Sequence, residues 1–329
     1  MDRSKALTLD PTITSLFAAS GLPAPTAATP LSGGVSCDVW RVESGGHLYA
    51  VKRALPQLRT AAEWLAPVER AESEVAWLKR VAAIAPAAVP RVVAEDPATH
   101  SFAMTFLADA PVWKDELMAG RVDPGVAAAL GRPLAQIHAA TADDPAVAAE
   151  FATMPLFDAL RIDPFVRYVA AREPGLAPRL DAIAADLASR KVALVHGDVS
   201  PKNILVGRDG PVILDAECAV YGDPAFDVAF CVTHLLLKLV HLPAHSDVLR
   251  DAARALGEAY LAGVTWEDRD AIAARAGTLV ATLALARVAG KSPAPYLVGT
   301  PGAATVRDAA RALLRTERSL LPLIESWPA

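Results

Sequence analysis

Short apolar runs separated by turn residues predict a small antiparallel sheet in the first third of the chain. Four runs have the length and apolar content of strands, at residues 35–42, 47–53, 89–94 and 102–107. The Ser44-Gly45-Gly46 segment between the first two runs is typical of a hairpin turn. Helical spacing of apolar residues predicts helices at 11–20 and 61–82, and we interpret the Pro- and Ala-rich residues 22–30 as a connector.

From residue 108 onward the apolar residues recur mainly with helical spacing. The predicted helices cover residues 124–140, 176–189, 225–240, 246–263, 267–289 and 303–325. Residues 192–215 are an exception, because short apolar runs there flank polar turns. The pattern predicts an α+β chain with a small β-rich domain at 1–107 and a larger, mainly helical domain at 108–329.

Composition narrows the classes of partner. The chain has 329 residues, 53% of them hydrophobic and 21% charged, and its formal net charge is −5. This excludes a disordered chain and argues against binding to nucleic acid or to an anionic membrane. The longest apolar stretch, 228–240, is shorter than the roughly 20 residues that span a bilayer. The N-terminus lacks the apolar core of a signal peptide and the three cysteines form no CxxC pair, so we expect a cytoplasmic protein.

The clearest chemical signal lies in residues 194–206, LVHGDVSPKNILV. Asp198 is followed five residues later by Asn203, in a polar loop that leads into an apolar run. Twelve residues after Asn203, another apolar run ends in Asp215, and Glu217 follows. An Asp can orient an attacking hydroxyl and accept its proton, and amide and carboxylate oxygens suit Mg²⁺. Phosphoryl transfer needs mainly positioning and charge neutralisation, for which this small set suffices.

Three motifs together resemble the aminoglycoside phosphotransferase/choline kinase family of small-molecule kinases. They are HGDVSPKN at 196–203, LDAE at 214–217 and YGDPAFD at 221–227. Their order and spacing make the resemblance specific, and it extends from Leu31 to at least His234. It implies the two-lobed fold of protein kinases, with a small β-rich N-lobe and a mainly helical C-lobe. It also implies ATP- and Mg²⁺-dependent transfer of the γ-phosphate to a hydroxyl of a small molecule.

In the C-lobe the resemblance implies a role for each motif residue. Asp198 matches the catalytic Asp of the loop. Asn203 and Asp215 match the metal-binding pair, and Glu217 matches a second acid that binds the metal or its water. Asp227 matches an acid that holds the loop from the following helix.

Two histidines are expected to be structural. His196 matches a position that braces the loop in the family. His138 lies in the apolar segment LAQIHAAT and reads as a packing residue.

In the N-lobe the resemblance implies that Lys52, in the strand YAVK, contacts the nucleotide phosphates. A Lys in this place needs a carboxylate to hold it extended, and the following helix offers Glu72 and Glu74. We favour Glu74, since it precedes Leu78 by one turn as the family's partner Glu does.

Two further N-lobe segments resemble nucleotide contacts. The loop LSGGVSC at 31–37 would cover the triphosphate, with Gly33, Gly34 and Ser36 beside it, because glycines let backbone N–H groups approach phosphates. Met104 and Phe106 resemble the hinge that hydrogen-bonds adenine.

Two other functions fit the residues less well. A protein kinase would carry Lys in place of Ser200 and Gly in place of Glu217, and it would have an Ala-Pro-Glu motif. A catalytically silent, kinase-like nucleotide-binding protein would have lost a metal ligand or the loop Asp, which are all present. The acceptor, the choice between ATP and GTP and the oligomeric state stay open.

Basic residues in the helical domain bear on the charge of the acceptor. His234 and Lys238 return to the side of the helix that carries Asp227, and Arg287 and Lys291 lie one turn apart further on. A pocket for a polycationic drug should instead be lined with acids. We therefore hypothesise an acceptor that is neutral or carries a carboxylate or phosphate. The alternative is that Lys238 and Lys291 extend into solvent.

Overall fold

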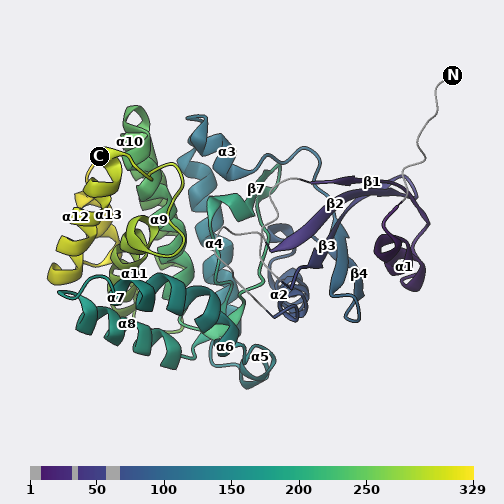
Figure 1. Ribbon diagram of the computed structural model, residues 1–329, viewed down its shortest axis with the longest axis horizontal. Coiled ribbons are helices and arrows are strands. Elements are labelled where there is room, and N and C mark those ends of the chain that lie inside the picture. The colour runs from purple at the N-terminus through teal and green to yellow at the C-terminus, as the bar shows by residue number, and fades with distance from the viewer. Residues whose placement is uncertain (1–8, 32–35, 57–66) are drawn as a thin grey trace. The chain divides into compact units, whose positions relative to one another are not determined.

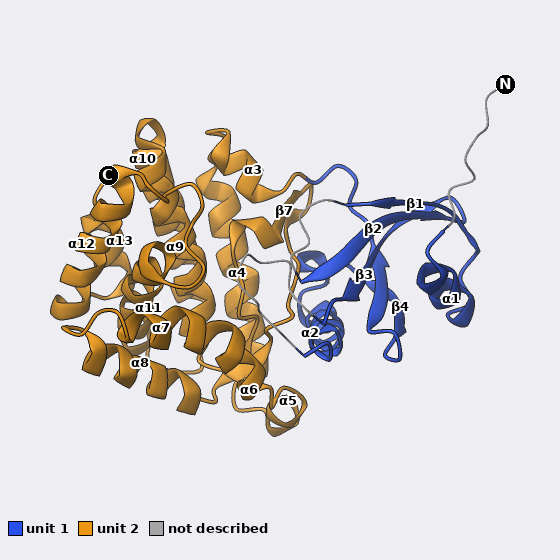
Figure 2. Ribbon diagram, viewed as in Figure 1, with its two compact units in different colours: residues 1–110 blue, residues 111–329 orange. Residues whose placement is uncertain are grey.

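The computed structural model describes residues 9–31, 36–56 and 67–329. The chain divides into two compact units, residues 1–110 and 111–329 (Figure 2). The boundary therefore lies between Ala110 and Pro111, three residues after the one expected.

Unit 1 contains an antiparallel sheet. In its described part five strands pair in the order β1-β2-β3-β5-β4 (Figure 1). The strands are β1 (Pro25–Pro30), β2 (Cys37–Ser44), β3 (His47–Ala54), β4 (Val92–Asp96) and β5 (Ser101–Thr105). The predicted hairpin is β2–β3. Gly45 and Gly46 turn it with φ of 56° and 78°, a backbone region that other residues rarely adopt.

The expected connector at 22–30 is wrong, because it contains the edge strand β1. Pro25 and Pro30 end this strand, which pairs with β2 only. Proline cannot donate a ladder hydrogen bond, so an edge is where a sheet tolerates it. Because proline is rare inside strands, the sequence pattern did not predict this strand.

Two helices pack on the sheet of unit 1. Helix α1 (Pro11–Ala19) contributes Ile13, Leu16 and Phe17 to a buried cluster with residues of the strands. Helix α2 (Arg70–Ile84) contacts β3, β4 and β5. The helix expected at 61–82 thus begins later than predicted in its described part, and residues 57–66 lie outside the description.

Unit 2 is mainly helical, as expected (Figure 1). Its described helices are α3 (Trp113–Met118), α4 (Pro124–Thr141), α5 (Pro145–Glu150), α6 (Met154–Phe157), α7 (Tyr168–Ala170), α8 (Ala177–Ser189), α9 (Ala225–His241), α10 (Ser246–Ala262), α11 (Arg269–Ala289), α12 (Pro301–Thr316) and α13 (Leu320–Ser326). Helix α9 packs against α10 and α11, and α10 packs against α4. Helix α11 is long and apolar enough for a membrane span, but 67% of that window is buried inside the unit, as in a core helix.

Two short ribbons replace the helical pattern between α8 and α9. β6 (Ala193–Val195) pairs with β9 (Val220–Gly222), and β7 (Ile204–Gly207) pairs with β8 (Gly210–Ile213). These ribbons bracket the loop at 196–203 and the acids that follow β8. The exception seen in the sequence at 192–215 is therefore the part of unit 2 that presents the motif residues.

The sequence pattern missed two features of unit 2. A π-helical segment, Asp158–Arg167, follows α6 and contains Pro164. The helix expected at 303–325 is two helices, because α12 ends at Thr316 and Glu317 adopts a φ of 47°.

The break between α12 and α13 packs closely on Gly277 of α11. A Cβ at Gly277 would collide with the carbonyl group of Arg318. We therefore expect Gly277→Ala to lower the free energy of unfolding by about 1–3 kcal/mol, although Ala is the better helix former. Urea denaturation measures the change. Gly175→Ala is the control, since a Cβ there meets nothing within 4 Å, and an equal effect of both substitutions would contradict the explanation.

Candidate active site

Lys52 and Glu74 form a buried ion pair in unit 1. Lys52 lies on β3 and is 6% exposed, and Glu74 lies on α2 and is 1% exposed. The Lys52 Nζ donates to both carboxylate oxygens of Glu74 at 2.7 Å. Glu72 instead contacts His100, with 3.1 Å between Oε1 and Nδ1. The partner expected from the sequence, Glu74, is therefore the observed one.

Burying such a pair costs desolvation, which the mutual attraction of the charges offsets only in good geometry. The two-pronged contact with Glu74 supplies that geometry and fixes the direction of the Lys52 side chain. A lysine whose ammonium is held in one place is better suited to bind a ligand group at a fixed position than a lysine that moves freely in solvent.

The loop expected to cover the triphosphate contains Gly33, Gly34 and Ser36, of which the structure describes Ser36. Gly33 and Gly34 lie outside the described residues. Ser36 is buried, and its carbonyl accepts hydrogen bonds from Leu55 N at 2.9 Å and from Arg70 at 2.6 Å. The fully buried Arg70, which sequence reasoning missed, also donates to the Leu55 carbonyl at 2.6 Å. Arg70 thus fixes the chain on the C-terminal side of the glycine pair.

The expected adenine hinge at Met104 and Phe106 stays a prediction. The backbone N–H of Phe106 donates to the carbonyl of Leu48 at 3.2 Å, so this donor is already used by the sheet. Met104 is buried in β5, where it pairs with Ala50 of β3. Hinge residues are hard to find from sequence because backbone groups carry no side-chain signature.

In unit 2 a single carboxylate holds the loop at 196–203. Asp227, in the first turn of α9, accepts the backbone N–H of His196 at 2.7 Å and that of Gly197 at 2.8 Å. His138 lies 3.3 Å from the same carboxylate through Nε2, and its Nδ1 lies 2.9 Å from the hydroxyl of Tyr260. The expected role of Asp227 and the packing role of His138 both agree with these contacts.

His196 braces the loop from inside. Its Nδ1 accepts the backbone N–H of Asp198 at 3.0 Å, so Nε2 carries the proton and faces the carbonyl of Leu214 at 3.1 Å. Burial lowers the pKa of His196, even though neighbouring acids raise it, and the ring is neutral. The ring links the loop to the residue before Asp215, which is a structural role.

Asp198 is buried among cationic and amide donors. Within the described residues its Oδ2 meets Asn203 Nδ2 at 2.9 Å, Lys202 Nζ at 3.0 Å and Arg161 at 3.1 Å. Burial tends to raise the pKa of Asp198, but Lys202 and Arg161 outweigh it, so the pKa lies below its usual value. The carboxylate is therefore ionised at neutral pH. The described part of the chain supplies no hydrogen-bond donor to Oδ1.

The residues expected to bind metal are Asn203, in the same loop, and Asp215 and Glu217, shortly after it. Asn203 donates through Nδ2 to the carbonyl of Asp198 as well as to its carboxylate, so the oxygen of the amide points elsewhere. The carbonyl of Asn203 accepts the N–H of Leu214 at 2.8 Å, which brings the backbone before Asp215 to the loop. Asp215 has a φ of 70°, a costly conformation for a residue with a side chain. Glu217 is buried nearby and raises the pKa of Arg161.

The chemistry of this donor set suits Mg²⁺. Among the residues that the structure describes, no group of three or more His, Cys, Asp or Glu could hold a metal ion. Mg²⁺ commonly takes one or two carboxylates and fills its other positions with water and nucleotide phosphates. An amide from Asn203 and acids from Asp215 and Glu217 match that pattern.

Sequence reasoning missed two cations beside Asp198. Arg161, on the π-helical segment, is buried and donates to the carbonyl of Gly197 as well as to Asp198. Lys202 is exposed, and Asp198 and Asp215 raise its pKa against partial desolvation. Lys202 lies inside the motif and could have been recognised there. Arg161 lies 36 residues before Gly197, and its one sequence signal was a charged residue in an apolar segment.

The alternative for Lys238, extension into solvent, is wrong. Its side chain is 2% exposed and burial lowers its pKa to about 7, whereas Lys291 is exposed. Helix α9 is buried nearly all round, which a polar stripe in the sequence does not reveal.

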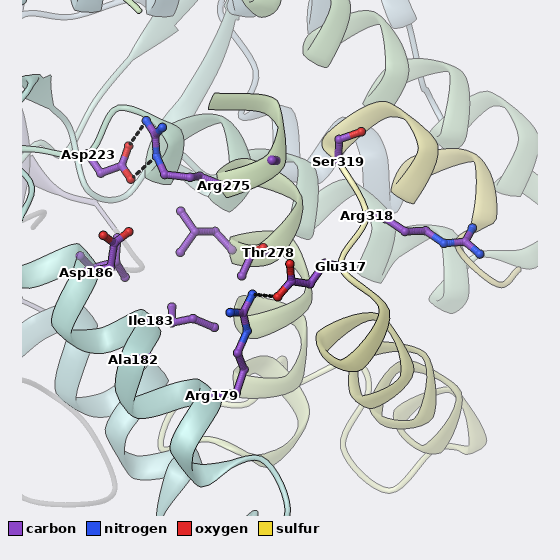
Figure 3. A pocket seen from close by; sticks show the side chains of 13 residues that line it. Arg179, Ala182, Ile183, Asp186, Asp223, Arg275, Thr278, Glu317, Arg318 and Ser319 are labelled. Atoms are coloured by element: carbon purple, nitrogen blue, oxygen red, sulfur yellow. Dashed lines mark hydrogen bonds and ion pairs between the residues drawn. The ribbon is translucent and has the colours of Figure 1, made fainter. Parts of the chain in front are cut away.

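A hollow of about 480 Å³ lies elsewhere in unit 2, between α8, α11 and residues 317–319 (Figure 3). Four of its charged side chains form two ion pairs. Arg179 meets Glu317 at 2.6 Å, and Arg275 donates two hydrogen bonds to Asp223, as Figure 3 shows. The predicted site residues do not line it, so we do not assign it to the reaction.

Residues 27–272 match the sequence profile of the Phosphotransferase enzyme family (APH). A methylthioribose kinase of Pectobacterium atrosepticum is 30% identical over 227 residues, covering 61% of this chain and 57% of that protein. One from Klebsiella pneumoniae is 30% identical over 231 residues, covering 62% and 58%. The match thus spans less than two thirds of the length of these relatives.

Solved structures show the same fold. A choline/ethanolamine kinase family protein from Mesorhizobium loti superposes with a TM-score of 0.53 at 19% identity, covering 91% of this chain and 92% of that one. An amicoumacin kinase superposes with a TM-score of 0.56 at 12% identity, covering 94% of each chain. The expected two-lobed, protein-kinase-like fold is confirmed.

Lys238 should make stability depend on pH. Its pKa of about 7 lies below the ordinary value of about 10.4, because burial and the charges of Arg287 and Lys114 oppose protonation. Between these values the unfolded chain binds a proton that the folded chain does not. The free energy of unfolding should therefore rise with pH, by up to about 1.4 kcal/mol per unit from this group.

Urea denaturation from about pH 7 to about pH 9 measures this slope. Lys238→Met should flatten it, while the exposed Lys191→Met should leave it unchanged. Equal slopes for Lys238→Met and the unmodified protein would show that Lys238 titrates normally.

Proposed function

The chain belongs to the Phosphotransferase enzyme family, and from this premise we propose that it transfers the γ-phosphate of ATP to a hydroxyl of a small molecule. The observation that supports this most is the state of Asp198. Its Oδ2 is held by Asn203, Lys202 and Arg161, while Oδ1 has no donor among the described residues. An ionised, immobilised carboxylate with one free oxygen is suited to orient an acceptor hydroxyl.

In this proposal Asp198 acts mainly by positioning. A carboxylate with a lowered pKa is a weak base, and the loose transition state of phosphoryl transfer demands little proton removal early on. Asp198 Oδ1 accepts the hydrogen bond of the acceptor hydroxyl, aims its oxygen at the γ-phosphate and receives the proton as the bond to phosphorus forms. Lys202, exposed beside Oδ2, places a positive charge near the transferred group.

The nucleotide residues keep the roles expected from the motifs. We propose that Lys52, held by Glu74, contacts the phosphates of ATP, and that Gly33, Gly34 and Ser36 belong to the loop over them. Bound Mg²⁺ would neutralise phosphate charge, and Asn203, Asp215 and Glu217 would hold it or its waters.

The acceptor class is open to direct measurement. Relatives named methylthioribose kinase make thiosugars one class to test, and amino alcohols, sugars and hydroxy acids are others. Formation of ADP in the presence of one acceptor supports the proposal. Binding of ATP with no acceptor-dependent ADP from any class would favour the silent nucleotide-binding alternative.

Replacing the positioning carboxylate should stop turnover and spare ATP binding. We expect Asp198→Asn to lower kcat by about a thousandfold or more, with the Kd for ATP changed by less than about threefold. Steady-state ADP formation and calorimetric titration with ATP measure the two effects. The matched control is Asp209→Asn, an exposed turn residue between β7 and β8. Near-normal turnover of Asp198→Asn would refute its role.

Loss of the Lys52 charge should weaken ATP binding, whereas loss of the Asp198 charge should lower kcat. We expect the double variant Lys52→Met/Glu74→Gln, which removes both charges of the buried pair, to raise the Kd and KM for ATP by about tenfold or more. The KM for the acceptor should change little. Lys79→Met, in an exposed pair with Glu95, is the control. Unchanged ATP affinity in the double variant would remove Lys52 from the nucleotide site.

A further inference from the structure

Four basic side chains and one phenol meet close to the catalytic loop of unit 2. We call Arg161, His234, Lys238 and Arg287, together with Tyr296, the basic cluster. The Lys238 Nζ lies 5.4 Å from the centre of the Tyr296 ring. The guanidinium carbons of Arg161 and Arg287 each lie 5.9 Å from the centre of the Phe165 ring.

His234 joins the same assembly through a second ring. Its ring centre lies 5.1 Å from that of Phe230, and Arg161 lies 5.8 Å from Phe230. The cluster therefore draws on the π-helical segment, on α9, on the last turn of α11 and on the segment after it. Arg161 connects it to Asp198 at 3.1 Å.

The cluster lacks negative charge. Lys238, His234 and Arg287 form no ion pair with any residue in the described ranges, and Arg161 shares Asp198 with Lys202. The acceptor nearest to the Lys238 ammonium is the carbonyl of His234, at a long 3.4 Å. Burying a cation without a partner is costly, so the presence of Lys238 and Arg287 side by side calls for a counter-charge.

Two polar atoms of the cluster also lack a partner. The Nε of Arg287 and the hydroxyl of Tyr296 are buried and make no hydrogen bond within the described structure. Arg287 otherwise donates to the carbonyl and hydroxyl of Ser292. Native proteins leave few such groups unsatisfied, and a bound ligand is one explanation of those that remain.

Electrostatics agree with these contacts. Burial lowers the pKa of His234, and the charges of Arg287, Lys238, Lys202 and Arg161 lower it further. Burial also lowers the pKa of Arg287, while Asp198 acts in the opposite direction. His234 is therefore neutral, while the charges of Lys238, Arg287 and Arg161 repel one another, and an anion placed among them would relieve that repulsion.

We propose that the basic cluster binds an oxyanion, a carboxylate or phosphate group, of the acceptor whose hydroxyl is presented to Asp198. The inference rests on the proposed function, since it assigns a charge to the acceptor of that reaction. The anion lies between Lys238, Arg287 and Tyr296, and Arg161 spans the distance between this anchor and Asp198. Methylthioribose, by its chemistry an uncharged thiosugar, would leave the cluster without its counter-charge.

Matched acceptors test the charge directly. The first set is ribose, ribonate and ribose 5-phosphate, and the second is glycerol, glycerate and glycerol phosphate. Each set compares an uncharged compound with a carboxylate and a phosphate of similar size. We expect a charged member to bind at least about tenfold more tightly than the uncharged one, by calorimetry. The carboxylate and phosphate arms show which oxyanion fits.

Variants connect this preference to the cluster. Arg287→Met and Lys238→Met should each weaken binding of the charged compound by about tenfold or more and raise its KM, with the KM for ATP within about twofold. Arg287→Lys, which keeps the charge, should retain part of the affinity. The controls are Arg254→Met and Lys191→Met, at exposed positions elsewhere in unit 2.

Failure of this inference differs from failure of the proposed function. Efficient turnover of uncharged acceptors, with a KM indifferent to Arg287→Met and Lys238→Met, would overturn the anionic acceptor and leave the kinase intact. Binding of the charged compounds that depends on the cluster, without ADP formation from any acceptor, would keep the anion site and refute the reaction. Binding of no anionic compound would overturn the inference outright.

Discussion

The carboxylate of Asp227 fixes the geometry on which the candidate site depends. It accepts two consecutive backbone N–H groups, from His196 and Gly197, and so sets the direction in which Asp198 leaves the loop. Gly197 has a φ of 81°, and a Cβ there would lie 2.7 Å from the carbonyl of Cys218, so only glycine suits this turn. Asp227 is in turn held by His138 of α4. The packed helices of unit 2 therefore fix the position of the loop that carries Asp198.

Charge balance around the loop explains what Asp198 can do. A buried carboxylate would ordinarily favour its protonated form, yet Lys202 and Arg161 keep this one ionised. Its Oδ2 is held by Asn203, Lys202 and Arg161, and in the proposed reaction its Oδ1, which has no donor among the described residues, receives the acceptor hydroxyl. Replacing Arg161 would change both the ionisation and the orientation of Asp198, since the same side chain also bonds the carbonyl of Gly197.

The sequence predicted the site best where its residues lie close together along the chain. The loop and its acids lie within some thirty residues, so their motifs could be matched together to the phosphotransferase family, and this resemblance implied the two-lobed fold. Lys52 and Glu74 were found through the same resemblance, because the strand YAVK and the Glu-x-x-x-Leu spacing match the family's Lys and its partner Glu. Arg161 could not be found in this way, because its partner is distant in sequence and π-helical turns have no simple period. The edge strand β1 was hidden by its prolines.

Two buried lysines show how differently the same residue type is used in this chain. Lys52 is 6% exposed and has both oxygens of Glu74 at 2.7 Å, so its charge is balanced within unit 1. Lys238 is 2% exposed, and among the described residues its ammonium meets the His234 carbonyl at 3.4 Å and the Tyr296 ring, while burial lowers its pKa to about 7. Apolar side chains of similar volume would fill the place of Lys238 at lower cost. A buried ammonium without a counter-ion lowers stability for as long as it stays unpartnered, and an anion that enters beside it recovers that free energy as binding.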